Sequence, residues 1–255
     1  SSSNRPPSDI NASNLSIAEN SAIGTVIGEF NATDPDGDTN ITYSLVPPLP
    51  SDLNLNLWLD ASDLSNADNS WLDKSGNARH ALKNGSATVV SDIHGKNSVM
   101  RYSGSGYHEW EKLNDIRTVF WVIRAANDNA GFLLSHPTHY HFHYGGTSST
   151  FWSFWSSTST NGFVKNGSLS VNGMRNIDGL STPMNSSLAK LSIVSLTMSG
   201  PNVVASRFSK DRNINSRQWK GDLGELMISK EVLSSDQINA VERYLAHKWG
   251  LQGDL

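Results

Sequence analysis

Short runs of alternating apolar and polar residues recur along most of the chain. Residues 55–59 alternate, and residues 191–198 divide into two faces, with Leu191 and Ile193 on one and Val194 and Leu196 on the other. Residues 118–123 are almost continuously apolar, which predicts a strand buried on both faces. Asn-Gly pairs at 166–167 and 172–173 flank the run 168–171 and indicate hairpin turns. Many short strands with frequent turns predict an all-β sandwich, jelly roll or barrel.

One segment near the end of the sequence has helical periodicity instead. Its apolar residues recur three or four positions apart and form one stripe: Ile238, Val241, Leu245 and Trp249. Ser234 and Gln237 fit a capping box before this stripe, and Gly250 suits the C-terminal cap after it. We therefore expect an amphipathic helix that packs against a sheet or plugs one end of the domain.

A proline cluster divides the chain into two parts. Residues 1–50 are rich in Ser, Asn, Pro and Asp, and they end in Val46-Pro47-Pro48-Leu49-Pro50, which favours an extended backbone. About 45 residues cannot easily bury a core of their own. The sequence therefore predicts a first segment over 1–50, which includes the proline-rich linker, and a larger domain over 51–255.

Composition narrows the class of protein. The net charge is −4, whereas nucleic-acid binders usually carry a basic surface, and no apolar run is long enough to span a membrane. Cysteine is absent, which excludes disulfides, thiolate metal sites and a cysteine nucleophile. Only 17% of the residues are charged, and the chain is rich in Ser, Thr, Asn and Gly instead. This composition is typical of extracellular β proteins. We expect a secreted or bacterial cell-surface location and, because residues 1–10 lack the features of a signal peptide, an excerpt of a larger chain.

Alternating carboxylates stand out in the first part at Asp34-Pro35-Asp36-Gly37-Asp38. Carboxylates this close together need either a cation or full solvation. The spacing is not that of an EF-hand. The residues alone leave a calcium site and a solvated Asp/Gly turn as alternatives.

The first part resembles the opening half of a cadherin-type repeat. The residues that carry the resemblance are Asn4-Arg5-Pro6-Pro7, Leu15-Ser16-Ile17-Ala18-Glu19-Asn20, Gly24, Phe30-Asn31-Ala32-Thr33-Asp34-Pro35-Asp36, Asn40 and Tyr43-Ser44-Leu45. The resemblance ends at Val46 and implies Ca²⁺ as a cofactor, with Glu19, Asp34 and Asp36 as its ligands. The second part would then be inserted into, or follow, an incomplete repeat. Its linker at 46–50 and the tail after Trp249 should lie close together.

The second part resembles the laminin-G-like, concanavalin A-like jelly-roll modules of large bacterial surface proteins. The resemblance spans roughly residues 53–252, and its segments are Leu57-Trp58-Leu59-Asp60-Ala61, Trp71-Leu72-Asp73-Lys74-Ser75-Gly76-Asn77, Trp219-Lys220-Gly221-Asp222-Leu223-Gly224-Glu225-Leu226 and Tyr244-Leu245-Ala246-His247-Lys248-Trp249-Gly250. It implies a two-sheet sandwich with one C-terminal amphipathic helix. By the habit of that family, it also implies a glycan or matrix ligand.

Histidines and aromatic residues crowd residues 136–155. Alternation along a strand would place His139, His141 and His143 on one face and Phe142 on the other. Sugar sites use aromatic faces together with a few polar groups. We therefore predict a ligand site formed by His139, His141, His143, Trp152, Trp155, Arg175 and Asn176. The alternatives are that most of these aromatics are core residues, or that the three histidines bind zinc.

The sequence gives little sign of catalysis. Glycosidases of the concanavalin A-like fold carry paired carboxylates on one strand, and no Glu-x-Asp-x-x-Glu pattern is present. Glu109 and Glu111 would share a strand face, but nothing else in that pattern follows, and Asp222 and Glu225 suit a turn or buried pairs. We therefore expect that the chain is not an enzyme.

Together these observations predict a ligand-binding module of a bacterial adhesin whose partner is a cell-surface or matrix carbohydrate. It would be a monomeric module of a larger chain, with no nucleic-acid partner and no membrane span. The alternatives are a structural or protein-binding adhesive spacer, and a glycan-active enzyme on the same fold.

Overall fold

The computed structural model describes residues 8–13, 16–37, 39, 41, 46–62, 64, 70–93, 97–126, 131–144, 162–164, 166–175 and 188–255. The chain separates into two compact units, Ser1–Leu45 and Val46–Leu255. The linker at 46–50 thus belongs to the second unit, where Leu49 packs against an apolar cluster.

The described residues of the first unit form one antiparallel strand pair. β1 (Ser8–Ala12) pairs with β2 (Phe30–Thr33). The apolar side chains Ile10, Ile23 and Phe30 are exposed. This exposure agrees with the expectation that so short a segment cannot bury a core of its own.

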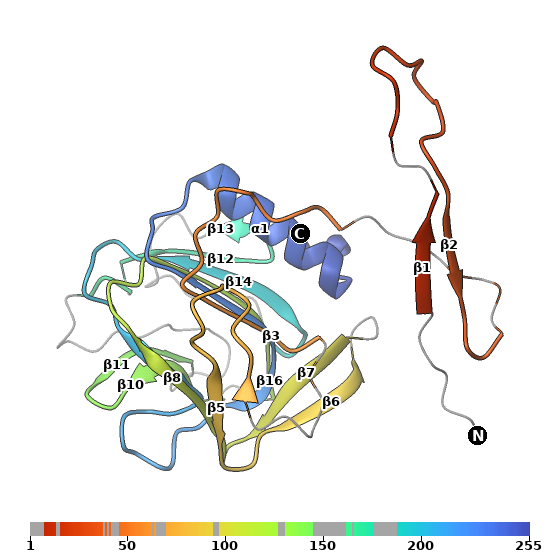
Figure 1. The fold of residues 1–255 in the computed structure, drawn as a ribbon. Helices are drawn as coiled ribbons and strands as arrows, with labels where there is room; N and C mark the ends of the chain where they lie inside the picture. Colours follow the sequence, from red (N-terminus) through yellow and green to blue (C-terminus); the bar gives the residue numbers. More distant parts are fainter. Residues whose placement is uncertain are drawn as a thin grey trace. The chain divides into compact units, whose positions relative to one another are not determined.

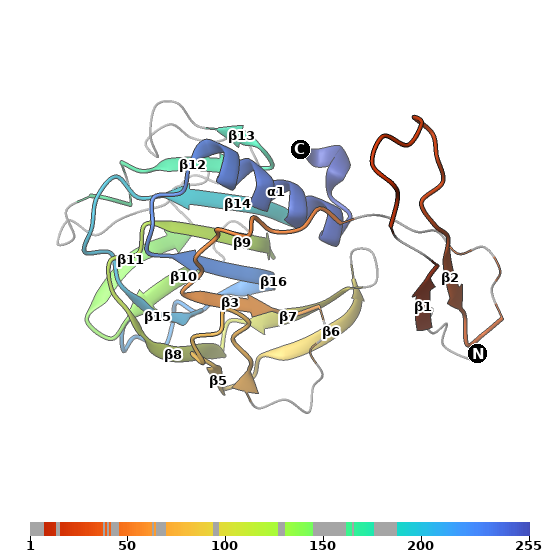
Figure 2. The same ribbon diagram turned by 45° about the horizontal axis from the view of Figure 1, so that its top comes forward.

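The described strands of the second unit form two antiparallel sheets (Figures 1 and 2). The six-stranded sheet has the order β11 (His139–Tyr144), β10 (Gly131–His136), β15 (Ala205–Phe208), β8 (Tyr107–Leu113), β5 (Ala81–Asn84) and β4 (Ser70–Trp71). The eight-stranded sheet has the order β13 (Met174–Arg175), β12 (Ser168–Val171), β14 (Ser192–Thr197), β9 (Thr118–Ala125), β16 (Lys220–Ser229), β7 (Asn97–Ser103) and β6 (Thr88–Ile93), and β3 (Leu57–Asp60) also pairs with β16.

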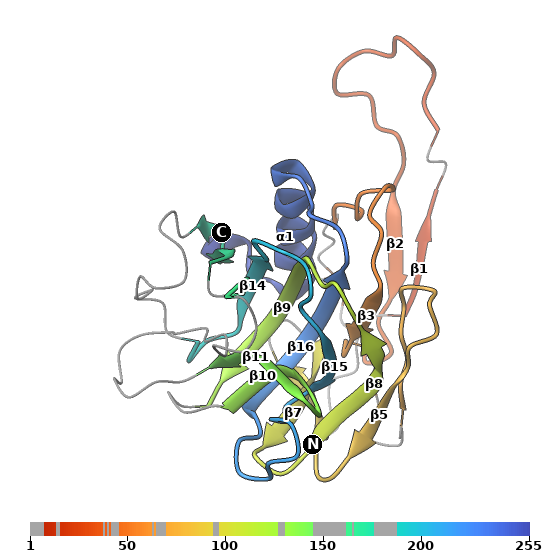
Figure 3. The same cartoon turned by 90° about the vertical axis from the view of Figure 1, so that its left-hand side faces the viewer.

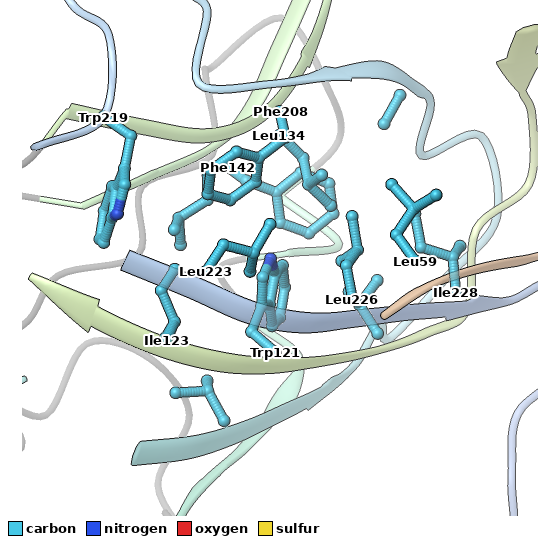
Figure 4. Packing of buried hydrophobic residues seen from close by; sticks show 14 of the residues in the cluster. Leu59, Trp121, Ile123, Leu134, Phe142, Phe208, Trp219, Leu223, Leu226 and Ile228 are labelled. Atoms are coloured by element: carbon cyan, nitrogen blue, oxygen red, sulfur yellow. The ribbon is translucent and has the colours of Figure 1, made fainter. Parts of the chain in front are cut away.

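A core lies between the two sheets. Both sheets contribute buried apolar side chains to it, among them Leu134, Phe142 and Phe208 from the six-stranded sheet and Trp121, Ile123, Leu223, Leu226 and Ile228 from the eight-stranded sheet (Figure 4). The prediction of an all-β chain built from antiparallel sheets with a C-terminal helix is therefore confirmed.

The helix α1 (Ser235–Trp249) covers the outer face of the eight-stranded sheet. Its apolar stripe packs with alternate residues of the sheet in a second cluster that includes Phe120, Val122, Ile193, Met227, Ile238, Val241, Leu245 and Trp249. Ser234 and Gln237 form the predicted capping box, and Gly250 closes the helix in the left-handed conformation. Because Trp121 faces the first cluster and Phe120 the second, β9 is buried on both faces as predicted.

The two ends of the second unit meet at the same cluster. Leu49 from the linker packs against it, and Leu251 from the tail after Trp249 belongs to it. Linker and tail therefore contact the same cluster, and their direct proximity stays a prediction. Within the described parts of the chain, no helix combines the length and the apolar character that a membrane crossing requires.

Candidate functional site

The outer faces of the two sheets differ in what covers them. Helix α1 lies on the eight-stranded sheet, whereas the described residues place no helix on the outer face of the six-stranded sheet, whose strands follow one another from β11 to β5 in Figure 3. Side chains there reach solvent: Leu82 is 60% exposed and the Glu111 side chain 77%. We call this surface the open face and define it by Leu82, Tyr107, Glu109, Glu111, Arg207, His136 and His139.

Strand β8 forms the centre of the open face. Its alternation buries His108 and Trp110 toward the core and turns Tyr107, Glu109 and Glu111 outward. The sequence therefore places two carboxylates and one phenol ring in a row on the solvent side of a rigid strand.

An ion pair fixes one of these carboxylates. Arg207 on β15 stands opposite Glu109 in the strand register, and its Nε donates to Glu109 Oε2 at 2.6 Å. The same guanidinium donates through a terminal nitrogen to the carbonyl oxygen of Arg212 at 2.8 Å. Arg207 is largely buried, whereas the Glu109 side chain is 41% exposed. The pair thus presents a positioned carboxylate edge to solvent.

Two cations flank the ring of Tyr107. The Nζ of Lys210 lies 4.7 Å from the ring centroid, and the Cζ of Arg207 lies 5.6 Å from it. Both distances fall within the range of cation–π attraction. The tyrosine is therefore held in place, and positive charge gathers at this end of the open face.

The hairpin between β10 and β11 carries a hydrogen-bonded trio. The Oγ1 of Thr138 lies 2.9 Å from Nδ1 of His136 and 2.7 Å from Nδ1 of His139. Burial lowers the pKa of His136, and the charges of Lys112, His139 and Arg207 lower it further, while Glu109 opposes them. His136 is therefore mainly neutral at pH 7, when an imidazole both donates and accepts a hydrogen bond.

The predicted ligand residues divide between this face and other places. His139 lies on the open face. His141 and His143 belong to β11, but their side chains, like the whole of Trp152, Trp155 and Asn176, lie outside the described residues. Arg175 lies on β13 of the other sheet, where its guanidinium donates to Asn239 Oδ1 of α1 at 2.5 Å. The structure therefore does not bring Arg175 to the hairpin histidines.

Phe142 shows which side of β11 faces the core. It is fully buried and meets the ring of Trp121 edge-on, with ring centroids 5.9 Å apart, so it faces the core as predicted. Two register irregularities between β10 and β11 interrupt the strict alternation of neighbouring positions.

The structure also places the predicted calcium ligands. Asp34 accepts a hydrogen bond from the backbone nitrogen of Asp36 at 2.8 Å, within a turn closed by Gly37 N and Asp34 O at 3.1 Å. Among the described residues, Glu19 included, no three acidic or histidine side chains are gathered as a metal site requires. As placed, Glu19, Asp34 and Asp36 therefore do not form a calcium cage, and calcium binding stays a prediction.

Sequence reasoning missed Tyr107, Arg207 and Lys210 as members of the open face. The alternation of residues 107–111 was a usable signal for Tyr107. Arg207 and Glu109 are 98 positions apart, and only the pairing of β8 with β15 brings them together.

Comparisons with known proteins give weak likenesses. No family model matches the chain, and no curated protein matches it. Domain 4 of a GH43 extracellular arabinanase from Geobacillus stearothermophilus, in complex with arabinotriose, is 12% identical, with a TM-score of 0.47, over 74% of this chain and 98% of that one. An exo-β-1,3-galactanase from Phanerochaete chrysosporium, with β-1,3-galactotriose, is 14% identical, with a TM-score of 0.24, over 68% of this chain and 29% of that one.

These comparisons correct one expectation. Both similar structures come from glycan-hydrolysing enzymes, which contradicts our expectation that the chain is not an enzyme. The likeness is too low to assign a catalytic role to any residue of this chain.

Proposed function

We propose that residues 46–255 form a carbohydrate-binding module of the laminin-G-like, concanavalin A-like type, which binds a glycan on the open face. One observation carries the proposal. A sheet packed on its inner side against the core presents on its outer side a row of positioned polar side chains, and described residues place no helix over them.

The chemistry of the open face suits sugar hydroxyls. The exposed carboxylate of Glu109 is an acceptor held in place by Arg207. The backbone nitrogen of Thr138 donates to Nδ1 of His136 at 3.3 Å, so a neutral His136 offers its Nε2–H as a donor. Shallow sugar sites combine a few such groups with aromatic surfaces. Trp152 and Trp155 follow β11 in the sequence, and we propose that they supply stacking surfaces, with His141 and His143 beside them. Asn176 follows Arg175 of β13 on the other sheet and is not part of the proposed site.

The two similar structures hold arabinotriose and β-1,3-galactotriose. The likeness of both structures to this chain is too low for their ligands to be assigned to it. The proposal rests on the residues of the open face.

A glycan array followed by titration calorimetry tests the proposal. Once the array identifies a ligand, Glu109→Gln should weaken its binding by about 1.5–3 kcal/mol, because a charged hydrogen-bond acceptor becomes a neutral one. Glu231→Gln is the matched control, since Glu231 is exposed and bonds Asn54 at the other side of the unit. Equal affinities of the two variants, or no glycan bound at all, would contradict the proposal, and the second result would favour the adhesive spacer.

Two further proposals concern the context of the module. We propose that it serves at the cell surface or in the extracellular space, as in an adhesin. We also propose that residues 1–45 belong to a partial cadherin-like segment that binds Ca²⁺. Calorimetric titration with calcium tests the latter: Asp34→Asn should abolish the binding heat, and a chain that binds no calcium removes the proposal.

A further inference from the structure

Basic residues are concentrated in the segment that joins the two sheets. Residues 207–220 contain Arg207, Lys210, Arg212, Arg217 and Lys220 against the single acid Asp211. This segment therefore carries a net charge of +4 in a chain whose net charge is −4. We call it the basic loop.

The one acid of the basic loop is enclosed. Asp211 is fully buried, and its carboxylate accepts from Arg212 Nε at 2.9 Å and from a terminal nitrogen of Arg217 at 3.1 Å. The Arg217 side chain is nonetheless 53% exposed. The negative charge therefore lies inside the loop, and the surface of the loop is positive.

Local hydrogen bonds fix the backbone of the basic loop. Ser209 adopts the left-handed region at φ 72°, and its buried hydroxyl donates to the carbonyl oxygen of Gly106 at 2.6 Å and accepts from the nitrogen of Trp219 at 2.9 Å. The carbonyl oxygen of Arg212 is held by Arg207. These contacts pre-organise the cationic side chains, which lowers the conformational cost of binding.

The basic loop borders the open face. The backbone nitrogen of Phe132 on β10 donates to the carbonyl oxygen of Arg217 at 3.0 Å, and Lys210 lies over the ring of Tyr107 on β8. A ligand at this border of the open face would therefore lie next to both residues.

The acids of this region already face guanidinium groups. Glu109 pairs with Arg207, and Glu111 lies 3.7 Å from Arg79 Nε. Lys112 is exposed and adds positive charge near His136. The excess charge that a ligand would meet is therefore positive.

We infer that the ligand is an acidic glycan, whose carboxylate or sulfate group is bound by Arg217 and Lys210 where the basic loop meets the open face. The inference rests on the proposed function and specifies its ligand class. A guanidinium matches the geometry of these oxyanions with paired N–H donors, and the lysine supplies a point charge. Both cations are partly exposed, so their contribution should fall as salt increases.

Matched glycans test this inference by calorimetry. The probes are a galacturonic acid oligomer with its methyl-esterified form, and dextran sulfate with unmodified dextran. Each pair keeps its sugar backbone and differs in charge. At least one charged probe should bind about tenfold or more tightly than its neutral partner, a difference equivalent to roughly 1.4 kcal/mol, and should lose affinity with added salt. The pair that shows the difference identifies carboxylate or sulfate as the group bound.

Variants then locate the contact. Arg217→Gln and Lys210→Gln should each weaken the charged probe about tenfold. Lys210 does not bind Asp211, so its variant stays informative even where Arg217→Gln disturbs the loop. Arg243→Gln is the matched control, because Arg243 is exposed on α1 at the opposite side of the sandwich. Equal binding of charged and neutral probes, or equal effects of Arg217→Gln and Arg243→Gln, would overturn the inference and leave the proposed function standing. A chain that binds no glycan overturns both.

Discussion

The indole nitrogen of Trp249 donates a hydrogen bond to Glu225 Oε2 at 2.8 Å, which ties the last turn of α1 to strand β16. Lys248 strengthens this connection, because its Nζ lies 2.9 Å from the same oxygen and 2.5 Å from Asp60 Oδ2 on β3. Glu225 and Asp60 stand opposite each other in the strand register. One buried ionic cluster therefore joins the helix to two strands of the sheet.

Replacing Lys248, which bridges the two carboxylates of this cluster, should destabilise the unit strongly. Lys248→Met leaves the buried Glu225 without its cation, while Asp60 keeps Lys74 at 2.8 Å, so we expect the free energy of unfolding to fall by about 3 kcal/mol. Urea denaturation measures this loss. Lys230→Met, at an exposed position, is the control and should change stability little. Similar small losses in both variants would show that the cluster does not hold the helix.

Gly224 should tolerate no side chain. A Cβ at this position would lie 2.8 Å from the Trp249 ring, so the helix packs directly on the backbone of the strand. We expect Gly224→Ala to destabilise the unit by about 1–3 kcal/mol through overpacking. Gly253→Ala is the control, because a Cβ there meets nothing within 4 Å. Thermal unfolding of the two variants compares them, and equal melting temperatures would contradict the predicted contact.

Buried His108 should make stability fall in mild acid. Burial, aided by the charge of Lys83, lowers the pKa of His108 from 6.5 to about 4. Burial also raises the pKa of Tyr102, whose hydroxyl lies 2.6 Å from His108 Nδ1 and so keeps its proton to donate. The unfolded chain therefore takes up a proton at His108 near pH 6.5, whereas the folded protein does so only near pH 4. The free energy of unfolding is unaffected by His108 above pH 6.5 and falls as the pH drops from 6.5 toward 4.

The double variant His108→Phe with Tyr102→Phe tests this pH dependence. Between pH 7 and pH 5, the free energy of unfolding of the unsubstituted protein should fall by about 2 kcal/mol more than that of the double variant. Denaturation curves at the two pH values give the difference. If both proteins lose the same amount, His108 is not the group that titrates.

The aromatic part of the predicted site has its own test. Trp152→Ala and Trp155→Ala should each cost about 1–3 kcal/mol of glycan affinity, since stacking surface is lost. Calorimetry measures the affinity, and circular dichroism confirms that each variant is folded. Should both variants bind normally, or both unfold, these tryptophans are not ligand contacts.

The sequence predicted those elements that depend on residues close together in the chain, such as helix α1 and the turn between β12 and β13. The capping box at Ser234 and Gln237 and the left-handed Gly250 fixed the bounds of α1 correctly. Asn172-Gly173 forms the predicted two-residue turn between β12 and β13, with φ of 48° and 75°. These features depend on residues within a few positions of each other, so the sequence alone contains the cause.

The open face and the buried pairs could be predicted only in part. For Glu225 and Asp222 the sequence left a turn or buried pairs as alternatives, and the structure has both in buried pairs, with Asp222 held by Arg101 and Arg124. Their partners, however, are up to 167 positions away, the separation of Trp58 from Glu225, and nothing local specifies them. Strand order alone decides which side chains meet across a sheet, as the separation of Arg175 from His139 onto different sheets shows.

Hydrogen exchange of the protein with and without a bound glycan tests the central claim most directly. Binding on the open face should slow exchange in β8, β10, β11 and β15 and in residues 209–218, and it should leave α1 and β13 unchanged. Protection confined to α1 and β13, around Arg175, would contradict the account, because it would place the ligand on the other sheet.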